Sequence, residues 1–357
     1  MRRKVWPVGL AALLLAAVPA CASTNIGGGG SSGGGSGSKD FVFAAAGGSN
    51  QDAIAKACVT PFAKAHGLNP IEDTSRSLTK LKLMVSSNKV TWNVVYNGVP
   101  DPASGDWSSL LTPLDYSVID KNQIFDGYAT KYGVAHDLYS DVMVYNTKTL
   151  GTNGPKTWAD LLNPSKKYGK IGVASVAYDG PINLTQMAWA AATGTNKYPI
   201  DPNAVTTKLN AIHPDLVYYD GAAQSQQLLT SGRVAAEDIV ASQAYELIDQ
   251  GYPLQVVWNQ NLSAPDWMEV PKGAPNQKLD MEFINYCLQK APQLLYSNEH
   301  PNGPINKAAA QALPAKLAEE LPSSPAHIAD AFPINQGYWS TDITGQFAND
   351  LQSIELG

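Results

Sequence analysis

The side chains that could do chemistry are densest in one stretch, VVWNQNLSAPDWMEVPKG at residues 256–273. Two tryptophans, two asparagines, a glutamine and an aspartate lie there between an apolar run and a Pro-Lys-Gly turn. The stretch contains no activated nucleophile and no cluster of metal ligands. Wide aromatic faces beside short amides and a carboxylate suit the non-covalent capture of a small polar molecule.

The rest of the chain offers no catalytic motif. Outside the glycine-serine tract at residues 27–38 there is no H-E-x-x-H, G-x-S-x-G, C-x-x-C or P-loop pattern. We therefore expect no enzymatic activity, no metal and no cofactor. A secreted hydrolase and a structural or adhesive surface lipoprotein are the alternatives. The histidines are scattered beside turn residues, which indicates surface or capping roles; they are His66, His136, His213, His300 and His327.

The N-terminus has the pattern of an export signal. Three cations at residues 2–4 precede an apolar run of about a dozen residues, and small residues then lead to Cys21. The run is shorter than the ~20 apolar residues of a membrane-spanning helix. We expect residues 1–20 to be a signal peptide and residues 21–39, rich in glycine and serine, to be a flexible linker.

The sequence VPAC, which ends at Cys21, resembles a bacterial lipobox, in which the cysteine becomes the lipid-modified first residue. A flexible tether is what a membrane-anchored domain needs, so we expect a lipid anchor at Cys21. Pro19 departs from the usual lipobox residue, and Ala20-Cys21-Ala22 also fits ordinary cleavage after Ala22. With the anchor, the chain is held on the outer face of the cytoplasmic membrane, in the periplasm or on the cell surface.

Composition and charge describe an acidic globular protein. Its 357 residues include 44% hydrophobic and 16% charged residues, enough for about two domains with a sizeable core. The net charge is -6 and becomes more negative once the cationic signal is removed. An acidic chain without basic runs argues against nucleic acid binding. Beyond Cys21 only Cys58 and Cys287 remain. An exported protein permits a disulfide between them, and two buried free thiols are the alternative.

Hydrophobic patterns predict strands that alternate with helices, and therefore an α/β fold with mostly parallel strands. Residues 52–66 predict a helix that is kinked near Pro61 and ends at Gly67. Strands are predicted at FVFAAA (41–46) and WNVVYN (92–97), and GVAHDLYSDVMVYN (133–146) contains strand-like runs around a polar centre.

The GGSN turn at residues 47–50 follows the first predicted strand and precedes the first predicted helix. In α/β sheets, ligands sit beyond the carboxyl ends of the strands, where helix N-termini present free N–H groups. Gly48 and Ser49 are therefore either part of a ligand-facing loop or part of a plain strand-to-helix turn.

Six motifs follow one another in the region from about residue 40 to 310: TWNVVYN, LLTPLD, MVYN, KTWADLLNPSKKYGKIGV, LLTSGRV and VPKGAPNQKLDMEFINYCL. In this order, behind an export signal, the chain resembles a bacterial substrate-binding protein of an ATP-driven importer, and in particular the spermidine/putrescine-binding group. The resemblance implies the type II periplasmic-binding-protein fold, with two α/β lobes, hinge strands and a central cleft. It implies that residues 40–138 and 262–357 form lobe one and residues 139–261 form lobe two. It also implies a monomer whose partners are a small-molecule solute, an ABC permease and its ATPase.

The resemblance places the stretch 256–273 at the return crossing between the lobes, against the cleft. In polyamine binders a tryptophan, one further residue and an aspartate precede the strand that ends in Ile-Pro-Lys-Gly. Here Asp266 keeps the aspartate, whereas Ala264 replaces the tryptophan. Asp266 is then expected to pair with a solute ammonium, with a rim or hinge salt bridge as the alternative. Trp258 is expected as a cleft wall, and Trp267 is expected in the core.

The same resemblance extends the expected site. Tyr139 and Ser140 stand where the family carries an aromatic-glycine pair. Asp179 lies near the family's acidic pair in lobe two, and Glu237 with Asp238 occupies another cleft-facing position. For these acidic residues an exposed surface role is the alternative.

Amide side chains complete the expected site. Asn259, Gln260 and Asn261 either read a polar group of the solute or serve turn chemistry. Asn93 corresponds to an aspartate of the family, and His136 lies in the crossing segment. Because few of the family's anchors are present, we expect a small polar, amine-bearing solute, such as a polyamine, an amino acid or a related compound.

Lipidation at Cys21 is testable by metabolic labelling. In bacteria that express the chain and are fed a palmitate analogue, we expect the wild-type protein to carry the label and the Cys21→Ser variant to lose it. Cys58→Ser is the matched control and should keep the label. An unlabelled wild-type protein would contradict the anchor and favour cleavage after Ala22.

Overall fold

The computed structural model describes residues 39–98, 105–166, 168–339 and 343–356, which belong to one unit, Lys39–Gly357. The predicted signal peptide, the glycine-serine linker up to residue 38 and the lipidation site at Cys21 lie outside the described residues. Within the described ranges, no helix has the length and apolar composition that crossing a bilayer requires.

One sheet of nine strands carries the fold: β1 (Asp40–Ala44), β2 (Asn69–Asp73), β3 (Val94–Asn97), β4 (Gly133–Asn146), β5 (Ile171–Ala174), β6 (Leu216–Tyr219), β7 (Ala236–Val240), β8 (Leu254–Glu269) and β9 (Gly303–Pro304). The strand order is β2-β1-β3-β8-β4-β7-β5-β6, and β9 pairs with β4. Parallel strands lie at each end of this order, and antiparallel pairs join them in the middle. The predicted α/β fold is confirmed, but the expectation of mostly parallel strands is wrong, because β4 and β8 pair antiparallel with each other, β4 also pairs antiparallel with β7 and β9, and β8 with β3.

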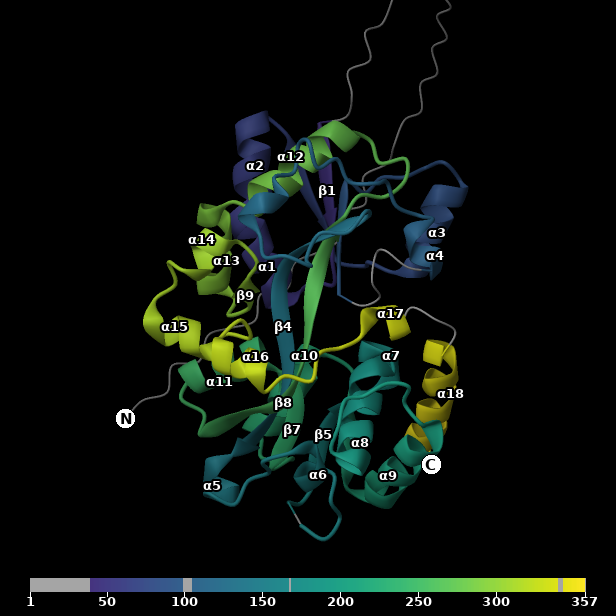
Figure 1. Ribbon diagram of the computed structural model, residues 1–357, viewed down its shortest axis with the longest axis vertical. Helices are drawn as coiled ribbons and strands as arrows, with labels where there is room; N and C mark the ends of the chain where they lie inside the picture. The colour runs from purple at the N-terminus through teal and green to yellow at the C-terminus, as the bar shows by residue number, and fades with distance from the viewer. Residues whose placement is uncertain (1–38, 99–104, 167, 340–342, 357) are drawn as a thin grey trace, which may run out of the picture. The chain divides into compact units, whose positions relative to one another are not determined.

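Helices pack around both ends of the sheet (Figure 1). The helices before strand β4 or after strand β8 are α1 (Gly48–Ile54), η1 (Ala55–Val59), α2 (Thr60–His66), α3 (Leu78–Ser86), α4 (Gly105–Ser108), η2 (Lys121–Gln123), α12 (Gln277–Cys287), α13 (Lys290–Glu299), α14 (Lys307–Ala310), α15 (Ala315–Glu320), α16 (Pro325–Ala329), α17 (Gln336–Trp339) and α18 (Ile343–Leu356). The helices between the long strands β4 and β8 are α5 (Thr147–Leu150), α6 (Trp158–Leu161), α7 (Val176–Asp179), α8 (Ile182–Thr193), α9 (Pro202–Ile212), η3 (His213–Asp215), α10 (Ala222–Thr230) and α11 (Ala241–Asp249).

The helical segment after β1 follows its sequence closely. α1 passes into η1, a π-helical turn, and then into α2. Pro61 has no N–H to donate to the carbonyl of Ala57, so the ordinary hydrogen bond is missing where the helix widens. Gly67 ends the segment in the left-handed conformation, with a φ of 64°. The predicted end at Gly67 is confirmed, and the predicted distortion near Pro61 takes the form of this π-turn.

The long strands β4 and β8 cross the whole sheet. They pair antiparallel from Gly133 opposite Glu269 to Asn146 opposite Leu254. At one end β8 also pairs with β3, and at the other end β4 pairs with β7. The crossing strands implied by the family resemblance are therefore present.

A bulge interrupts this ladder. Asp141 stands opposite Leu262, but Met143 stands opposite Val257, so residues 258–261 leave the register. Gln260 has a φ of 66°, a conformation that non-glycine residues adopt only where the surroundings hold it. The bulge lies within the stretch 256–273, in place of the turn that the amides suggested.

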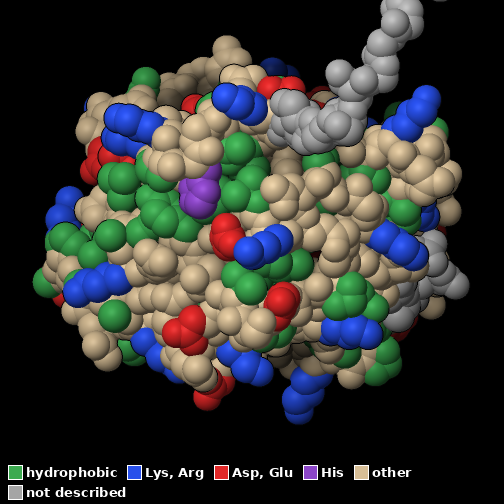
Figure 2. Space-filling model, turned by 90° about the horizontal axis from the view of Figure 1, so that it is seen from above, with side chains coloured by type: hydrophobic (Ala, Val, Ile, Leu, Met, Phe, Trp, Pro, Cys, Tyr) green, Lys and Arg blue, Asp and Glu red, His purple; other side chains and the backbone are tan. Residues whose placement is uncertain are grey.

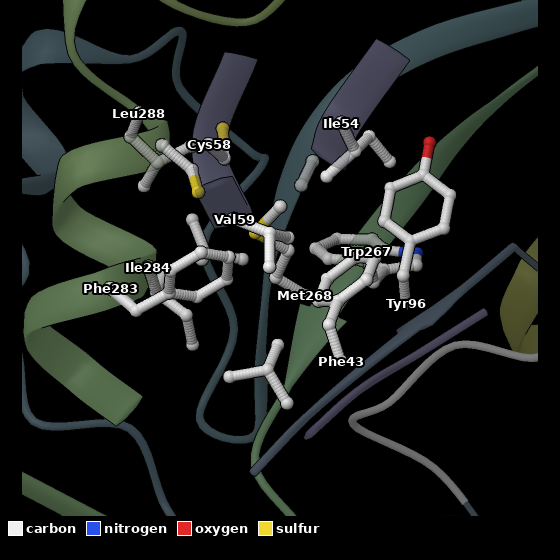
Figure 3. Close-up of a cluster of buried hydrophobic side chains, with 14 of the residues drawn as sticks. Phe43, Ile54, Cys58, Val59, Tyr96, Trp267, Met268, Phe283, Ile284 and Leu288 are labelled. Atoms are coloured by element: carbon white, nitrogen blue, oxygen red, sulfur yellow. The ribbon is translucent and has the colours of Figure 1, made fainter. Parts of the chain in front are cut away.

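The two largest of four groups of buried hydrophobic side chains lie at the two ends of the sheet. The first gathers β1, β3, α12 and the end of β8, with Trp267 in its centre (Figure 3). The second gathers β5, α6, α8 and α9. Leu138 packs in the first group and Tyr139 against the second, at the position where the lobe boundary on β4 is predicted. Trp267 is 4% exposed, as the sequence predicted for a core residue. Cys58 and Cys287 are both buried and free.

The packing departs from the predicted lobe boundaries in two places. Leu262 and Ala264 pack in the second group, so the change on β8 comes after residue 264. The C-terminal part is predicted in lobe one, but Ile334, Trp339, Phe347, Leu351 and Ile354 also pack in the second group, and α18 lies beside α9 in Figure 1. The reason is that the chain runs along β8, where Phe332 N–H donates to Asn261 and Ile334 N–H to Ser263. The other boundaries stay a prediction.

The surface seen from above mixes both signs of charge. Lysine, arginine and acidic side chains alternate over it with hydrophobic patches between them (Figure 2). This face therefore carries no broad basic region of the kind that nucleic acid binding requires.

Glu237 on β7 is a buried carboxyl inside the second lobe. It is 0% exposed, Ser225 donates to its Oε1, and its Oε2 has no partner among the described residues. Gly172 leaves the space that the side chain fills, because a Cβ there would lie 2.6 Å from Glu237 Oε2. Burial raises the pKa of Glu237 to about 9. The group is therefore neutral at pH 7.

We expect Glu237→Gln to stabilise the protein at alkaline pH. Because the folded pKa exceeds the unfolded value, the stability contributed by the protonated carboxyl is complete below about pH 4.5 and is lost as the pH rises toward 9. The amide cannot ionise, so at pH 8 the variant should exceed the wild type by roughly 2–4 kcal/mol in unfolding free energy. At pH 4.5 the two should differ by less than about 1 kcal/mol.

Urea titrations at both pH values measure this difference. Glu72→Gln, at an exposed carboxyl on β2, is the matched control and should leave the pH dependence unchanged. An equal effect of Glu237→Gln at both pH values would show that the carboxyl does not titrate in the folded state.

Candidate functional site

A polar cavity of about 100 Å³ lies at the carboxyl ends of β1 and β3, beside the crossing strand β8. Its volume suits a small solute. It brings together the loop after β1, the segment before α3, the end of β3 and one residue of β8. The lining residues are Ala45, Ala46, Gly47, Asn50, Gln51, Arg76, Tyr96, Gly98 and Asp266.

The GGSN turn does face this cavity. Gly47 and Gly48 have φ values of 80° and 75°, which glycine adopts without strain and which start α1 abruptly after β1. Gly47 N–H donates to Gln51 Oε1 at 2.8 Å. Gln51 is 2% exposed, and its Nε2 has no partner among the described residues. The lining comes from Gly47 and Asn50; Gly48 and Ser49 are not among the lining residues, and Ser49 Oγ lies 3.5 Å from His300 Nδ1.

Arg76 supplies the positive charge of the cavity. Its backbone N–H is fixed on the Ala45 carbonyl, just before Ser77 caps α3. Its Nε is buried and has no hydrogen-bond partner among the described residues. The guanidinium also forms no ion pair with any described residue. A guanidinium in this state is suited to a carboxylate, which it can bind through two parallel hydrogen bonds.

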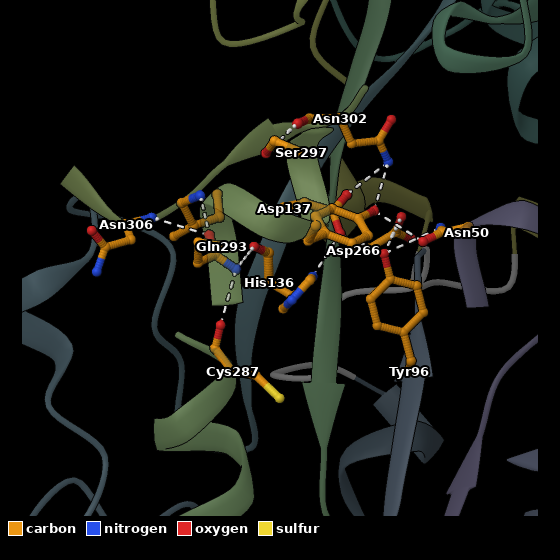
Figure 4. Close-up of polar contacts among 12 residues, drawn as sticks. Asn50, Tyr96, His136, Asp137, Asp266, Cys287, Gln293, Ser297, Asn302 and Asn306 are labelled. Atoms are coloured by element: carbon orange, nitrogen blue, oxygen red, sulfur yellow. Dashed lines mark hydrogen bonds and ion pairs between the residues drawn. The ribbon is translucent and has the colours of Figure 1, made fainter. Parts of the chain in front are cut away.

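Asp266 supplies the acidic side chain of the cavity. It lies directly opposite Asp137 in the β4–β8 ladder, and like charges in that position repel one another. Tyr96 Oη stands between them, 2.5 Å from Asp137 Oδ2 and 3.0 Å from Asp266 Oδ2 (Figure 4). Burial and the neighbouring Asp137 raise the pKa of Asp266 to about 8.

Asp137 is held more firmly than Asp266. Asn302 Nδ2 donates to its Oδ1 at 2.9 Å, and His136 Nδ1 lies 3.0 Å from its Oδ2. Burial disfavours the imidazolium of His136, but the contacts with Asp137 and Cys58 outweigh it and raise the pKa of His136 to about 9. His136, predicted as a possible ligand contact, therefore serves Asp137 as a buried positive partner.

Tyr139 is not among the lining residues but lies next to Gly98, which is one of them. A Cβ at Gly98 would lie 2.9 Å from Asp266 Oδ1 and 3.7 Å from the Tyr139 ring. Gly98 thus keeps open the space beside the carboxyl. Burial and the surrounding carboxyl groups raise the pKa of Tyr139 well above its usual value, so its hydroxyl stays a neutral donor.

An acidic group lies beyond Tyr139 and comprises Asp141, Asp179 and Asp238. Asn183 Nδ2 donates to Asp141 at 2.9 Å and to Asp179 at 2.7 Å. Asp238 is 2% exposed, and its Oδ1 has no partner among the described residues. Burial, followed by mutual repulsion, raises the pKa of Asp141 and Asp238 well above the usual range. Loss of hydration raises the pKa of Asp179 to about 7, although its side chain keeps contact with solvent.

The bulge residues do not line the cavity. Trp258 stacks on His327 at 3.7 Å between ring centroids, and its Nε1 donates to Tyr245. Asn259 Nδ2 donates to the Lys156 carbonyl. Gln260 accepts from the Trp158 indole through its carbonyl. Because the bulge turns these side chains out of the ladder, they hold the segment around α16 and the start of α6.

Strand alternation separates the other predicted pair. Successive side chains of β4 point to opposite faces, so Tyr139 and Ser140 cannot both face the cavity. Ser140 is buried and donates to Asn261 Oδ1 at 2.9 Å. Glu237 is enclosed in the second lobe, one residue from Asp238 on the opposite face of β7. Asn93 is buried and donates to Asp280 at 2.9 Å, away from the cavity lining.

Sequence reasoning missed Gln51, Arg76, Tyr96, Asp137 and Asp141. One signal was available, since Arg76 and Arg233 are the only arginines beyond the predicted signal peptide. The others carried no local signal, because their positions depend on which strands become neighbours. Among the described residues, no group of histidine, cysteine and acidic side chains could hold a metal ion.

Known proteins share this architecture. Residues 57–326, more than half of the chain, match the model of the bacterial extracellular solute-binding protein family. A gamma-aminobutyric acid-binding protein of Pseudomonas aeruginosa is 29% identical over 313 residues, which cover 85% of this chain and 87% of that protein. A solved GABA receptor has a TM-score of 0.81 at 30% identity, with 88% of this chain and 97% of that chain covered. An ABC transporter substrate-binding protein of Bradyrhizobium japonicum has a TM-score of 0.80 at 26% identity, with 88% and 99% covered.

The polyamine resemblance is more distant. A spermidine/putrescine ABC transporter substrate-binding protein of Streptococcus pneumoniae has a TM-score of 0.71 at 18% identity, which shows a common fold alone. The two-lobed periplasmic-binding-protein fold expected from the sequence is confirmed by these neighbours. This chain belongs to the bacterial extracellular solute-binding protein family and is a solute-binding component of ABC-type import.

Proposed function

We propose that the protein captures a small zwitterionic amino acid of the ω-amino acid type and delivers it to an ABC permease driven by an ATPase. The observation that carries this proposal is the pairing of opposite charges on one small cavity: Arg76 with an unpartnered Nε, and Asp266 on the crossing strand. The relatives named for GABA, itself an ω-amino acid, support the same class.

The two ends of the solute are assigned by the charges. Arg76 and the Nε2 of Gln51 offer donors without partners, so the solute carboxylate lies there. Asp266, beside the space left by Gly98, receives the ammonium, and Tyr139 presents an aromatic ring nearby. Asn50 fixes Tyr96 from the other side, because its Nδ2 donates to the Tyr96 oxygen at 3.3 Å.

Capture depends on closure of the lobes, because only the closed form contacts the solute from both sides. The solute first meets the residues of lobe one, and a hinge motion along the crossing strands then brings the acidic group of lobe two toward it. The closed form docks on the permease. The protein acts as a monomer, tethered by Cys21 and the glycine-serine linker to the outer face of the membrane.

A diamine or polyamine is the second candidate. It is favoured by the acidic group of Asp141, Asp179 and Asp238, which carries no cationic partner among the described residues and would suit a second ammonium. Arg76 opposes this candidate, because it would face a cation.

Calorimetry with three unbranched four-carbon solutes separates the candidates. GABA carries both charges, putrescine carries two ammonium groups and butyrate carries only the carboxylate. We expect the wild-type protein to bind GABA at least tenfold more tightly than either of the others. Arg76→Gln should weaken GABA by roughly 10–100-fold, the value of a charge-assisted hydrogen bond, and should leave putrescine nearly unchanged. Asp266→Asn should weaken both GABA and putrescine.

Matched controls exist for both substitutions. Arg233→Gln changes the exposed arginine, and Asp280→Asn changes a buried aspartate that does not line the cavity. Both should keep the affinity for GABA. Tighter binding of putrescine than of GABA would replace the first candidate by the second. Affinities that neither Arg76→Gln nor Asp266→Asn changes would remove these residues from the site.

A further inference from the structure

We propose that Asp266 carries a proton before solute binds and releases it to solvent when a solute ammonium takes its place. The inference rests on the proposed function, since it concerns the same carboxyl and the same amine-bearing solute. It adds a property that the solute class alone does not require, which is the exchange of one cation for another.

The number of hydrogens around Tyr96 carries the argument. Its hydroxyl has one hydrogen and two lone pairs. The oxygen lies 2.5 Å from Asp137 and 3.0 Å from Asp266, and it accepts from Asn50 Nδ2 at 3.3 Å. The single hydroxyl hydrogen can satisfy only one of the two carboxyl groups. The other contact is a hydrogen bond only if that carboxyl brings its own hydrogen and donates it to the remaining lone pair.

The surroundings decide which carboxyl is protonated. Asp137 receives the shorter contact from Tyr96, a hydrogen bond from Asn302 and the close approach of His136. These contacts already occupy both oxygens of Asp137 as hydrogen-bond acceptors. Asp266 has only the longer contact with Tyr96 among the described residues, and it stands directly opposite Asp137 in the ladder. The proton therefore resides on Asp266.

The charged and titratable groups that face Asp266 do not provide enough positive charge to keep its carboxyl ionised. Arg76 favours the carboxylate, but burial and Asp137 outweigh it. The other groups that interact with Asp266 electrostatically are His136, Tyr96, Tyr139, Tyr296 and Asp141. Of these only His136 can be positive, and its ring lies against Asp137.

The exchange balances in charge. The O–H bond of the Asp266 carboxyl breaks, its proton passes to water, and the carboxylate keeps the electron pair and binds the solute ammonium. One positive charge leaves the cavity and one enters it. With the pKa of Asp266 at about 8, we expect the affinity for the amine to rise with pH between 6 and 8, by up to tenfold per unit, and to level off above 8.

Calorimetry in buffers of different ionisation enthalpy measures the number of protons released per solute bound. The full chain is titrated with GABA, and with putrescine if that binds more tightly, in phosphate and in Tris at pH 7.0 and pH 9.0. At pH 7.0 the dependence of the observed enthalpy on the buffer should correspond to about 0.9 proton released per solute, and at pH 9.0 to about 0.1.

Two variants locate the proton. Asp266→Asn should abolish the release at pH 7.0 while binding persists at lower affinity. Asp280→Asn removes another buried carboxyl whose pKa is raised by burial, to about 7, and should leave the release unchanged. Binding heat that is the same in both buffers would overturn the exchange and leave the proposed function standing. Release that survives Asp266→Asn would overturn its assignment to Asp266. No binding heat in any buffer would overturn both.

Discussion

The antiparallel pairing of β4 with β8 is the constraint on which the rest of the structure depends. Between its two register shifts the ladder is regular from Asp137 opposite Asp266 to Asp141 opposite Leu262. In a regular strand every second side chain faces the same way. Asp137, Tyr139 and Asp141 therefore form one row across the junction of the two lobes. The backbone of these buried strands is fixed by mutual hydrogen bonds, so the row cannot move away from Asp266 on its partner.

The ladder thus places carboxyl groups closer together than their charges favour. In lobe one, Asp137 is contacted by His136, Asn302 and Tyr96. This hydrogen-bond network extends to Asn50 and Tyr296. The acidic group of lobe two has only the amide of Asn183 between Asp141 and Asp179. Buried charge without a partner is costly, and proteins keep it mainly where a ligand completes it. Under the proposed function, the well-supported Asp137 holds the fold, and the less supported carboxyl groups face the solute ammonium.

How much of this could be predicted from the sequence depends on the range of the interactions. The strand-like runs within 133–146 and the helix end at Gly67 follow from local pattern; the runs belong to one continuous strand, β4, and the helix end is confirmed. The fold class and the solute-binding role came from motifs in a recognisable order. The bulge at 258–261 was out of reach, because it arises from a register mismatch between strands more than a hundred residues apart. For the same reason Trp258, the residue that looked most like a ligand wall, packs on His327 instead.

The family relationship is evident over most of the chain, whereas the choice of solute depends on a few residues. About 30% identity over most of the chain is sufficient to fix two lobes and a cleft, since a fold tolerates many substitutions that conserve the hydrophobic pattern. The choice of solute depends on a few charges. A monocarboxylate leaves Asp266 without its cation, and a diamine places an ammonium against Arg76. In the proposed site the diamine leaves an ammonium against a guanidinium, which costs more than a missing apolar contact, whereas the monocarboxylate leaves Asp266 protonated and gains no ion pair there. Under the proposed function, a diamine therefore meets repulsion at Arg76 and a monocarboxylate gains no contact at Asp266, so a solute that carries both charges is favoured.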